Sequence, residues 1–489
     1  MQTPIPMRST SAAVSLFATL SLLLGLLMPG SSLAQADRDL PSFGESGVVP
    51  VGQEYMMGRV WLMSYRRQVP ALEDPLIQDY LETLIYRLAE TSELKDRRLI
   101  LITVDNQSIN AFAVPGGVVG VHSGLVRQAE TESQLASVLT HELGHISQRH
   151  FSRGVEASQR SQIPTLAGLL GGMVAIVAGA GDAGIAAIMG TQAAAQQNQL
   201  KFSRGHEKEA DRVGIQNLAR AGMDPAGAAN MFEVMQANSR GARPPEFMLT
   251  HPLTETRIAD ARNRARQYPK RVYADNPEFQ LMRTRIQVGF FRNEEEAEGY
   301  YRKKLKRKGR NAEAHQYGLI LVLTQKREYA EALELLAPLR AYRPDNLAYI
   351  LAEADIYTES GEFDDALELL GRNWMLMPGN HPLTMAVVKT HLRAGRYSEA
   401  EKILEPHAKS RSSDPYVWYV LAETQGLTGN QYGLHQSRAQ YFYLNGQMLP
   451  ARSQLGYALQ LAPDEVARER IRIEQRSVEA AARGLGQMR

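Results

Sequence analysis

The segment 138-VLTHELGHISQRH-150 combines three histidines and a glutamate with aliphatic residues that repeat every three or four positions. This spacing predicts an amphipathic helix, and Thr131 with Gln134 forms a capping box at its start. On such a helix His141 and His145 project from the same face, one turn apart. Because aliphatic residues surround these titratable side chains, we expect the histidines and the glutamate to bind a group in the interior of the protein.

The pattern H-E-x-x-H in this segment is typical of zincins, in which two imidazoles occupy two positions of a tetrahedral zinc ion. Glu142, between the histidines, then faces the metal-bound water. The alternative is a surface helix with scattered histidines, which agrees poorly with the aliphatic residues around the pair. Gly144 costs roughly 1 kcal/mol in a helix interior, so we expect a closely packed neighbour there. We expect His150, beyond the motif, to be exposed.

A third metal ligand has to come from elsewhere, and the chain contains no cysteine. The segment 203-SRGHEKEADRVGIQNLARAGMDP-225 predicts a second helix with three candidates, His206, Glu207 and Glu209. On a helical projection Glu207 and Asp211 share an inward stripe, whereas Glu209 points to the opposite side. An inward carboxylate is costly unless it is paired or metal-bound. We therefore expect Glu207 to be the third ligand and Asp211 to hydrogen-bond a ligating histidine or a bound water.

The N-terminus has the pattern of a secretory signal peptide. Arg8 precedes an almost unbroken apolar run from Ala12 to Met28, and small residues follow at Ala34 and Ala36. We expect residues 1–36 to be a cleaved signal that exports the chain. The alternative is an uncleaved anchor, for which the run is short against the roughly 20 residues that span a membrane. The net charge of +2 gives no indication of nucleic-acid binding.

Residues 165–189 are almost entirely apolar or glycine. They predict either a buried helical hairpin or a loop that contacts a membrane or a partner. Contact with a membrane would make the protein peripherally membrane-associated.

Closer to the N-terminus, helical spacing extends from about Gly52 to Leu88. Two short β-rich runs follow, Arg97–Val104 and Gly116–Val126.

The C-terminal half contains internal repeats of 34 residues. Two series have this spacing: Tyr329, Phe363 and Tyr397, and Ala332, Ala366 and Ala400. An aromatic residue and an alanine at this period are typical of tetratricopeptide repeats, which stack into a superhelix with a concave surface. A further, degenerate copy begins at Gly446. The basic run Arg302–Arg310 before the repeats is interpreted as a solvated helix face or linker, with a docking patch as the alternative.

These patterns predict an α+β, mostly helical chain in which a zincin-like metalloprotease domain precedes an α-helical tetratricopeptide superhelix. We expect the signal peptide at 1–36, the protease domain at 37–270, a basic helical linker at 271–310 and the repeats at 311–489.

Four segments together resemble the zinc metalloproteases related to HtpX and the CAAX prenyl protease. They are NAFAVPGGVVGVHSGLV from Asn110, HELGH, EKEAD, and LTHPLTETRIADARNRA from Leu249. With the export signal and the repeats, the chain is similar to the periplasmic members of that family. The resemblance implies one zinc ion per subunit, bound by His141, His145 and Glu207. It also implies that Glu142 is the general base of peptide hydrolysis.

The same resemblance implies roles for three further residues. His251 and Arg257 would stabilise the tetrahedral oxyanion, and Asp211 would be a proton donor or a partner of a metal ligand. His251 could equally take the fourth zinc position and close the resting enzyme, since catalytic zinc needs an open site. Val118–Val121 resembles the edge strand that aligns an extended peptide substrate.

For function, the resemblance implies a periplasmic zinc endopeptidase, with a chaperone-like role, in assembly and quality control of outer-membrane β-barrel proteins. Unfolded or misassembled outer-membrane proteins would be its substrates, and the repeats would bind the β-barrel assembly machinery. The alternative is a repeat-based chaperone or scaffold with a vestigial protease fold. The intact H-E-x-x-H and E-x-x-x-D motifs argue against the alternative.

Overall fold

The computed structural model describes most of the chain: residues 49–154, 193–239, 244–307, 309 and 311–487. The expected signal peptide and the apolar segment 165–189 lie outside the described residues. Among the residues that are described, no helix is both long and apolar enough to cross a membrane.

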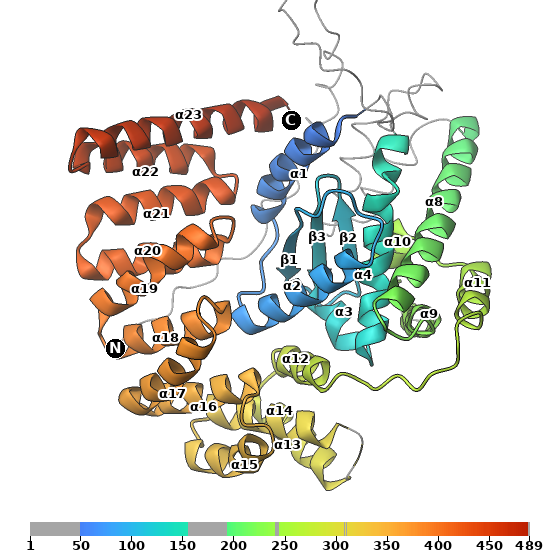
Figure 1. The fold of residues 1–489 in the computed structure, drawn as a ribbon, viewed down its shortest axis with the longest axis horizontal. Coiled ribbons are helices and arrows are strands. Elements are labelled where there is room, and N and C mark those ends of the chain that lie inside the picture. The colour runs from blue at the N-terminus through green and yellow to red at the C-terminus, as the bar shows by residue number, and fades with distance from the viewer. Residues whose placement is uncertain (1–48, 155–192, 240–243, 308, 310, 488–489) are drawn as a thin grey trace, which may run out of the picture.

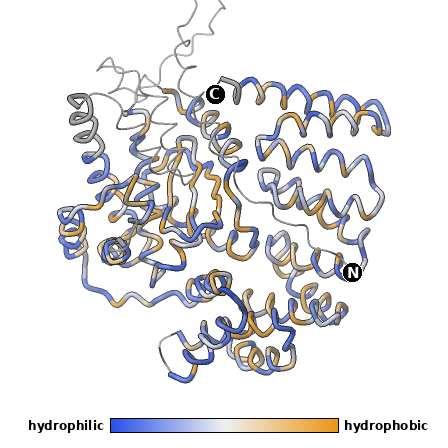
Figure 2. The backbone as a smooth tube through the Cα atoms, turned by 180° about the vertical axis from the view of Figure 1, so that it is seen from behind, coloured by the Kyte–Doolittle hydropathy of each residue, from blue (hydrophilic) through white to orange (hydrophobic). Residues whose placement is uncertain are grey.

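A three-stranded sheet lies at the centre of the N-terminal half (Figure 1). Its strands are β1 (Ile100–Val104), β2 (Ala111–Val114) and β3 (Val118–His122), in the order β1-β3-β2. β3 pairs parallel with β1 and antiparallel with β2. All five residues of β3 are buried, as expected for a central strand, and the strands are hydrophobic along most of their length (Figure 2).

The sheet order overturns two details of the sequence analysis. Val118–Val121 is not an edge strand, because β3 bonds to a neighbour on each side; β2 is the edge strand on this side of the sheet. The β-rich run Gly116–Val126 is also too long for one strand. The chain leaves the sheet at His122 and continues as helix α3 (Ser123–Gln128).

In the described part of the N-terminal half, the helices besides α3 are α1 (Val51–Arg66), α2 (Pro75–Glu90), α4 (Glu132–Ser147), α8 (Ala193–Arg220), α9 (Gly227–Asn238), α10 (Glu246–Thr250) and α11 (Glu255–Ala265). Of these, α1, α2 and α4 contact the sheet, and α8 and α9 pack against α4. The helical spacing expected from Gly52 to Leu88 is divided between α1 and α2. Asp74 caps α2 by accepting from the backbone N–H groups of Leu76 and Ile77. The predicted cap of α4 is confirmed, since the Thr131 side chain accepts from the backbone N–H of Gln134.

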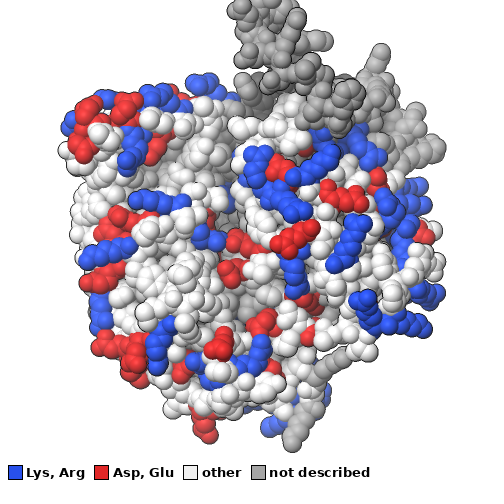
Figure 3. Space-filling view, viewed as in Figure 1, with Lys and Arg blue, Asp and Glu red and all other residues white. Residues whose placement is uncertain are grey.

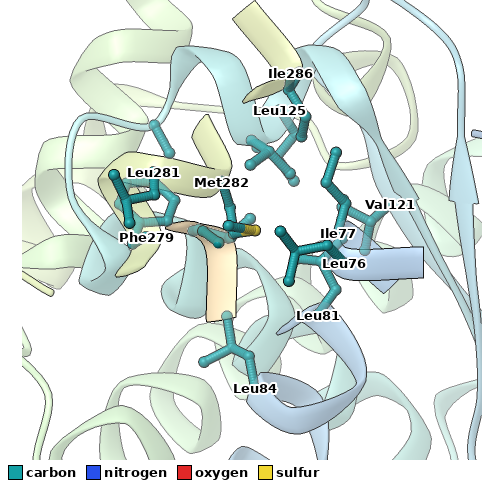
Figure 4. Packing of buried hydrophobic residues seen from close by; sticks show 14 of the residues in the cluster. Leu76, Ile77, Leu81, Leu84, Val121, Leu125, Phe279, Leu281, Met282 and Ile286 are labelled. Carbon is teal, nitrogen blue, oxygen red and sulfur yellow. The ribbon is translucent and has the colours of Figure 1, made fainter. Parts of the chain in front are cut away.

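The region expected to be a linker forms α12 (Pro277–Val288) and α13 (Glu294–Lys306). α12 is mainly buried. Phe279, Leu281 and Met282 are at most 1 % exposed and pack with residues of α2, β3 and α3 (Figure 4). The same hydrophobic cluster continues into the first repeats, so this segment joins the two halves through a shared core.

The C-terminal half is entirely helical in its described residues: α14 (Ala312–Gln325), α15 (Tyr329–Tyr342), α16 (Leu347–Ser360), α17 (Phe363–Leu376), α18 (His381–Arg393), α19 (Tyr397–Ser410), α20 (Pro415–Thr428), α21 (Gln431–Leu444), α22 (Met448–Leu461) and α23 (Glu465–Gln487). The three aromatic residues of the 34-residue series begin α15, α17 and α19. The three alanines of the second series are fully buried. The expected fold class is confirmed.

The last repeats keep the 34-residue period. The second helices of the pairs begin at residues 329, 363, 397, 431 and 465. Gly446 precedes α22, which is the first helix of its pair, so the degenerate copy aligned there is half a repeat out of register. A short sequence match does not distinguish the two helices of a pair, because both have an apolar face of the same period.

The repeats curve around the N-terminal half and return to it (Figure 1). α18 packs against α2, and α21 and α23 contact α1. Arg411 forms an ion pair of 2.9 Å with Glu82, and Arg66 donates to the carbonyl oxygen of Ser413. A cavity of about 420 Å³ lies between β1 and this part of the array.

Charges of both signs are interspersed over the face seen in Figure 3, in agreement with the small net charge.

Candidate active site

α4 and α8 approach each other so closely that their contact requires glycine. A Cβ atom on Gly144 would lie 3.2 Å from Cα and O of Ala210, which confirms the closely packed neighbour expected there. A Cβ atom on Gly214 would lie 3.0 Å from the backbone nitrogen of His141. This contact lets short carboxylate side chains on α8 reach imidazoles on α4.

Three side chains converge between these helices. Nε2 of His141 and Nε2 of His145 are 3.0 Å apart, and they lie 3.5 and 3.4 Å from the two carboxylate oxygens of Glu207. In a tetrahedral site with ligand bonds of about 2.0 Å, the ligand atoms are about 3.3 Å apart. The two imidazoles and the carboxylate therefore fit a divalent cation.

His251 brings a fourth ligand atom to the same cluster. It follows α10, and its Nδ1 lies 3.3 Å from Nε2 of His141 and 3.1 Å from Oε1 of Glu207. Its Nε2 lies 3.4 Å from Oε1 of Glu142. The ring stacks on Phe247 with a centroid distance of 4.5 Å. The loop after α10 thus places an imidazole where a catalytic site keeps an open position.

Glu142 is almost completely buried, with 1 % of its surface exposed. Burial raises the pKa of its carboxyl group and outweighs the opposite effects of His251, His141 and a hydrogen bond from the backbone N–H of Ala113 in β2. Oε1 makes no hydrogen bond. The edge strand therefore holds this carboxyl group beside the ligand cluster and leaves one oxygen available for a proton.

His141 is supported by a buried ion pair. Its Nδ1 lies 2.9 Å from Oδ1 of Asp211, and Arg257 donates to both oxygens of that carboxylate at 2.8 Å. Arg257 also contacts Glu207 at 2.9 Å and donates to the carbonyl oxygen of Pro252. Burial alone lowers the pKa of His141, but the two carboxylates outweigh burial and raise it to about 10. The site favours positive charge at this position.

His145 is supported differently, and this support was missed in the sequence. His150 is 5 % exposed, so the expectation that it is exposed is wrong. Its Nδ1 lies 2.9 Å from Nδ1 of His145, and its Nε2 lies 3.1 Å from Oε2 of Glu209. Arg149 adopts a left-handed conformation (φ 51°), which ends α4 and turns the chain back. Arginine seldom adopts this conformation, so the sequence gives no signal of the turn.

The surroundings of His150 restrain its ring. His206 stacks on it with a centroid distance of 4.1 Å and an interplanar angle of 4°. Glu209 is held in turn by Arg153 at 2.7 Å. Burial lowers the pKa of His150 and outweighs the opposite effect of Glu209. His150 therefore lies between a metal-ligand candidate and a carboxylate, and its burial opposes protonation.

Comparison with known proteins identifies a peptidase family in the N-terminal half and tetratricopeptide repeats in the C-terminal half. The model of Peptidase family M48 matches residues 75–265, and a tetratricopeptide repeat model matches 323–372 and 357–423. The beta-barrel assembly-enhancing protease of Yersinia pestis is 34 % identical over 474 residues, which cover 93 % of this chain and 96 % of that one. The chain belongs to the beta-barrel assembly-enhancing protease family.

Other relatives extend this result. The beta-barrel assembly-enhancing protease of Escherichia coli K12 is 36 % identical over 355 residues, which cover 70 % of this chain and 71 % of that one. The mitochondrial metalloendopeptidase OMA1 of Arabidopsis thaliana is 28 % identical over 190 residues, 39 % of this chain and 36 % of that one. This member of the beta-barrel assembly-enhancing protease family is a metalloendopeptidase. Its tetratricopeptide repeats indicate interaction with other proteins.

Proposed function

We propose that the chain is a periplasmic zinc endopeptidase, with a chaperone-like role, in the assembly and quality control of outer-membrane β-barrel proteins. The names of its relatives and the secretory pattern at its N-terminus support this location and role. Its substrates are unfolded or misassembled outer-membrane proteins. The repeats recruit these substrates or the β-barrel assembly machinery.

The convergence of His141, His145 and Glu207 carries the proposal. Two imidazoles and one carboxylate form a donor set typical of catalytic zinc, in which the fourth position serves water or substrate in the active state. When bound, zinc supplies an activated water and polarises the scissile carbonyl group. Glu142 takes the proton of the attacking water on its unbonded oxygen and delivers it to the leaving amine. Since β2 is the edge strand beside Glu142, we assign to it the alignment of the substrate backbone.

Arg257 has a positioning role in this proposal. Three of its nitrogen atoms already bind Asp211, Glu207 and the carbonyl oxygen of Pro252. Its guanidinium group therefore orients Glu207, a metal-ligand candidate, and Asp211, which supports His141. Because its nitrogen atoms are used in these contacts, we do not assign it to direct contact with the oxyanion. Of the two oxyanion candidates, His251 lies at the fourth position of the cluster, with its Nδ1 3.3 Å from Nε2 of His141.

A Glu142→Gln variant tests the catalytic role. It should bind zinc with the affinity of the parent protein and lose peptide hydrolysis by about 10²–10⁴-fold, because the amide cannot accept the proton. Metal content and cleavage of an unfolded outer-membrane protein would be measured together. Retention of hydrolysis would contradict the proposal, and full rescue of a deletion strain by this variant would favour the non-catalytic chaperone instead.

We further propose that His251 closes the resting enzyme by taking the fourth metal position. The contacts of its Nδ1 with His141 and Glu207, at 3.3 and 3.1 Å, support this role. A His251→Ala variant should then degrade substrates faster than the parent. Simple loss of activity would instead assign His251 to stabilisation of the oxyanion.

A further inference from the structure

The chain of contacts behind His145 has a defined direction. It runs from Arg153 through Glu209 and His150 to His145, with distances of 2.7, 3.1 and 2.9 Å. Each donor and acceptor in it can be assigned from chemistry, starting from the carboxylate, which only accepts hydrogen bonds when ionised.

Because Glu209 accepts, Nε2 of His150 carries the proton. A neutral imidazole with its proton on Nε2 has a lone pair on Nδ1, and this lone pair faces Nδ1 of His145. The proton in that contact therefore belongs to His145 Nδ1. His145 is left with a lone pair on Nε2, the atom that lies 3.0 Å from Nε2 of His141 in the ligand cluster.

We propose that His150 is a positioning residue that sets the metal-binding tautomer and ring orientation of His145. Glu209 in turn sets the tautomer of His150 by accepting its Nε2–H. The inference rests on the proposed metal site. It assigns a role to a histidine outside the H-E-x-x-H motif and to a carboxylate that does not reach the metal. Metal-ligating histidines need such a partner at the second ring nitrogen, and its loss costs 10- to 100-fold in metal affinity.

The geometry argues against a purely space-filling role. The His150 side chain is 5 % exposed, so water does not replace its lone pair easily if that lone pair is removed. Stacking with His206 holds the ring plane, and the contact with Glu209 holds its rotation. Both restraints act on a ring whose remaining nitrogen faces a metal-ligand candidate.

Two substitutions separate hydrogen bonding from packing. His150→Phe keeps a stacking ring and removes the acceptor. His150→Asn loses the ring but places an amide oxygen near the position of Nδ1. Lys208→Gln, at an exposed position on α8 beside Glu209, is the matched control.

The readouts are Zn²⁺ affinity, measured by competition with a chromophoric chelator, and the visible spectrum of the Co²⁺-substituted protein. We expect His150→Phe to weaken Zn²⁺ binding by about 10- to 100-fold and to change the Co²⁺ spectrum. His150→Asn should recover most of the affinity, and Lys208→Gln should match the parent. Parent-like affinity in His150→Phe, or equal losses in the Phe and Asn variants, would overturn the inference.

A second variant covers the case in which His150→Phe fails to fold. Glu209→Leu changes a partly exposed side chain and removes the acceptor for His150. It should weaken Zn²⁺ binding by a smaller factor than His150→Phe. Unchanged binding would contradict the proposal that Glu209 acts on His145 through His150. Failure of the parent protein itself to bind Zn²⁺ would instead contradict the proposed function, so the two failures are distinguishable.

Discussion

The two histidines of the H-E-x-x-H motif are supported by ion pairs that differ in their exposure to solvent. Behind His141 stands a buried pair, in which the side chains of Asp211 and Arg257 are 9 and 4 % exposed. Behind His145 the charged pair is one ring further away, and the side chains of Glu209 and Arg153 are 28 and 40 % exposed. Ion pairs in water contribute little, whereas breaking a buried pair is costly. Breaking the Asp211–Arg257 ion pair should therefore cost more stability than breaking the Glu209–Arg153 ion pair.

Removing the metal tests both supports at once and should have the largest effect. We expect chelation to abolish peptide hydrolysis and to lower the free energy of unfolding by about 4 kcal/mol relative to protein in Zn²⁺ at about 1,000 times its Kd. Calorimetry and a peptide cleavage assay before and after chelation would check this, with activity restored by added Zn²⁺. Undiminished cleavage after complete metal removal would contradict a metal-dependent reaction.

Asp211→Asn breaks the buried support alone. It leaves the Arg257 charge without its main partner, which should destabilise the fold by about 3–5 kcal/mol. It also removes the carboxylate next to Nδ1 of His141, so Zn²⁺ affinity should fall about 10- to 100-fold. Denaturant unfolding and chelator competition would measure these effects, with Lys208→Gln as the control. An unfolding free energy within 1 kcal/mol of the parent would show that the pair is not structurally important.

Arg257→Lys should have an intermediate effect. Lysine keeps the positive charge but cannot form the bidentate contact with Asp211 and still reach the carbonyl oxygen of Pro252. We expect a loss of about 1.5–3 kcal/mol in the free energy of unfolding, the range for hydrogen bonds to charged groups. If Arg257 acted directly on the oxyanion, kcat would fall much more than stability or metal affinity, so measurement of all three separates the two roles.

Arg153→Ala should have the smallest effect, because its pair with Glu209 is open to solvent. The expected loss is at most about 1 kcal/mol in the free energy of unfolding, and it should decrease further at high salt. Zn²⁺ affinity should change less than twofold, since Glu209 still accepts from His150. A larger, salt-independent effect would show that the two supports are more alike than their exposure suggests.

Much of this site was predictable because it depends on helical periodicity. Four-residue spacing places His141 and His145 on one face of α4, and the same rule places Glu207 and Asp211 on one face of α8. The structure brings these four side chains together with Glu142. The cost of a helix-interior glycine likewise predicted the close packing at Gly144, and the 34-residue spacing predicted the stacked repeats.

Other features escaped prediction because they depend on contacts between distant segments. β2 has four residues and follows no long pattern, so the sequence did not show that it lies outside β3. His150 was expected to be exposed because the left-handed turn at Arg149 has no signal in residue type. The burial of Phe279 in α12 also had no signal in the sequence, since it depends on the helices around it.

The sequence by itself determined which side chains share a helix face, because a local period of 3.6 residues is a property of the backbone alone. It also determined the presence of repeats and the chemistry of the metal-ligand candidates. The tertiary structure decided which strand forms the edge, what supports each ligating histidine, and how the repeats return to contact α1 and α2. These features arise from packing between segments far apart in the chain, and no local pattern encodes them.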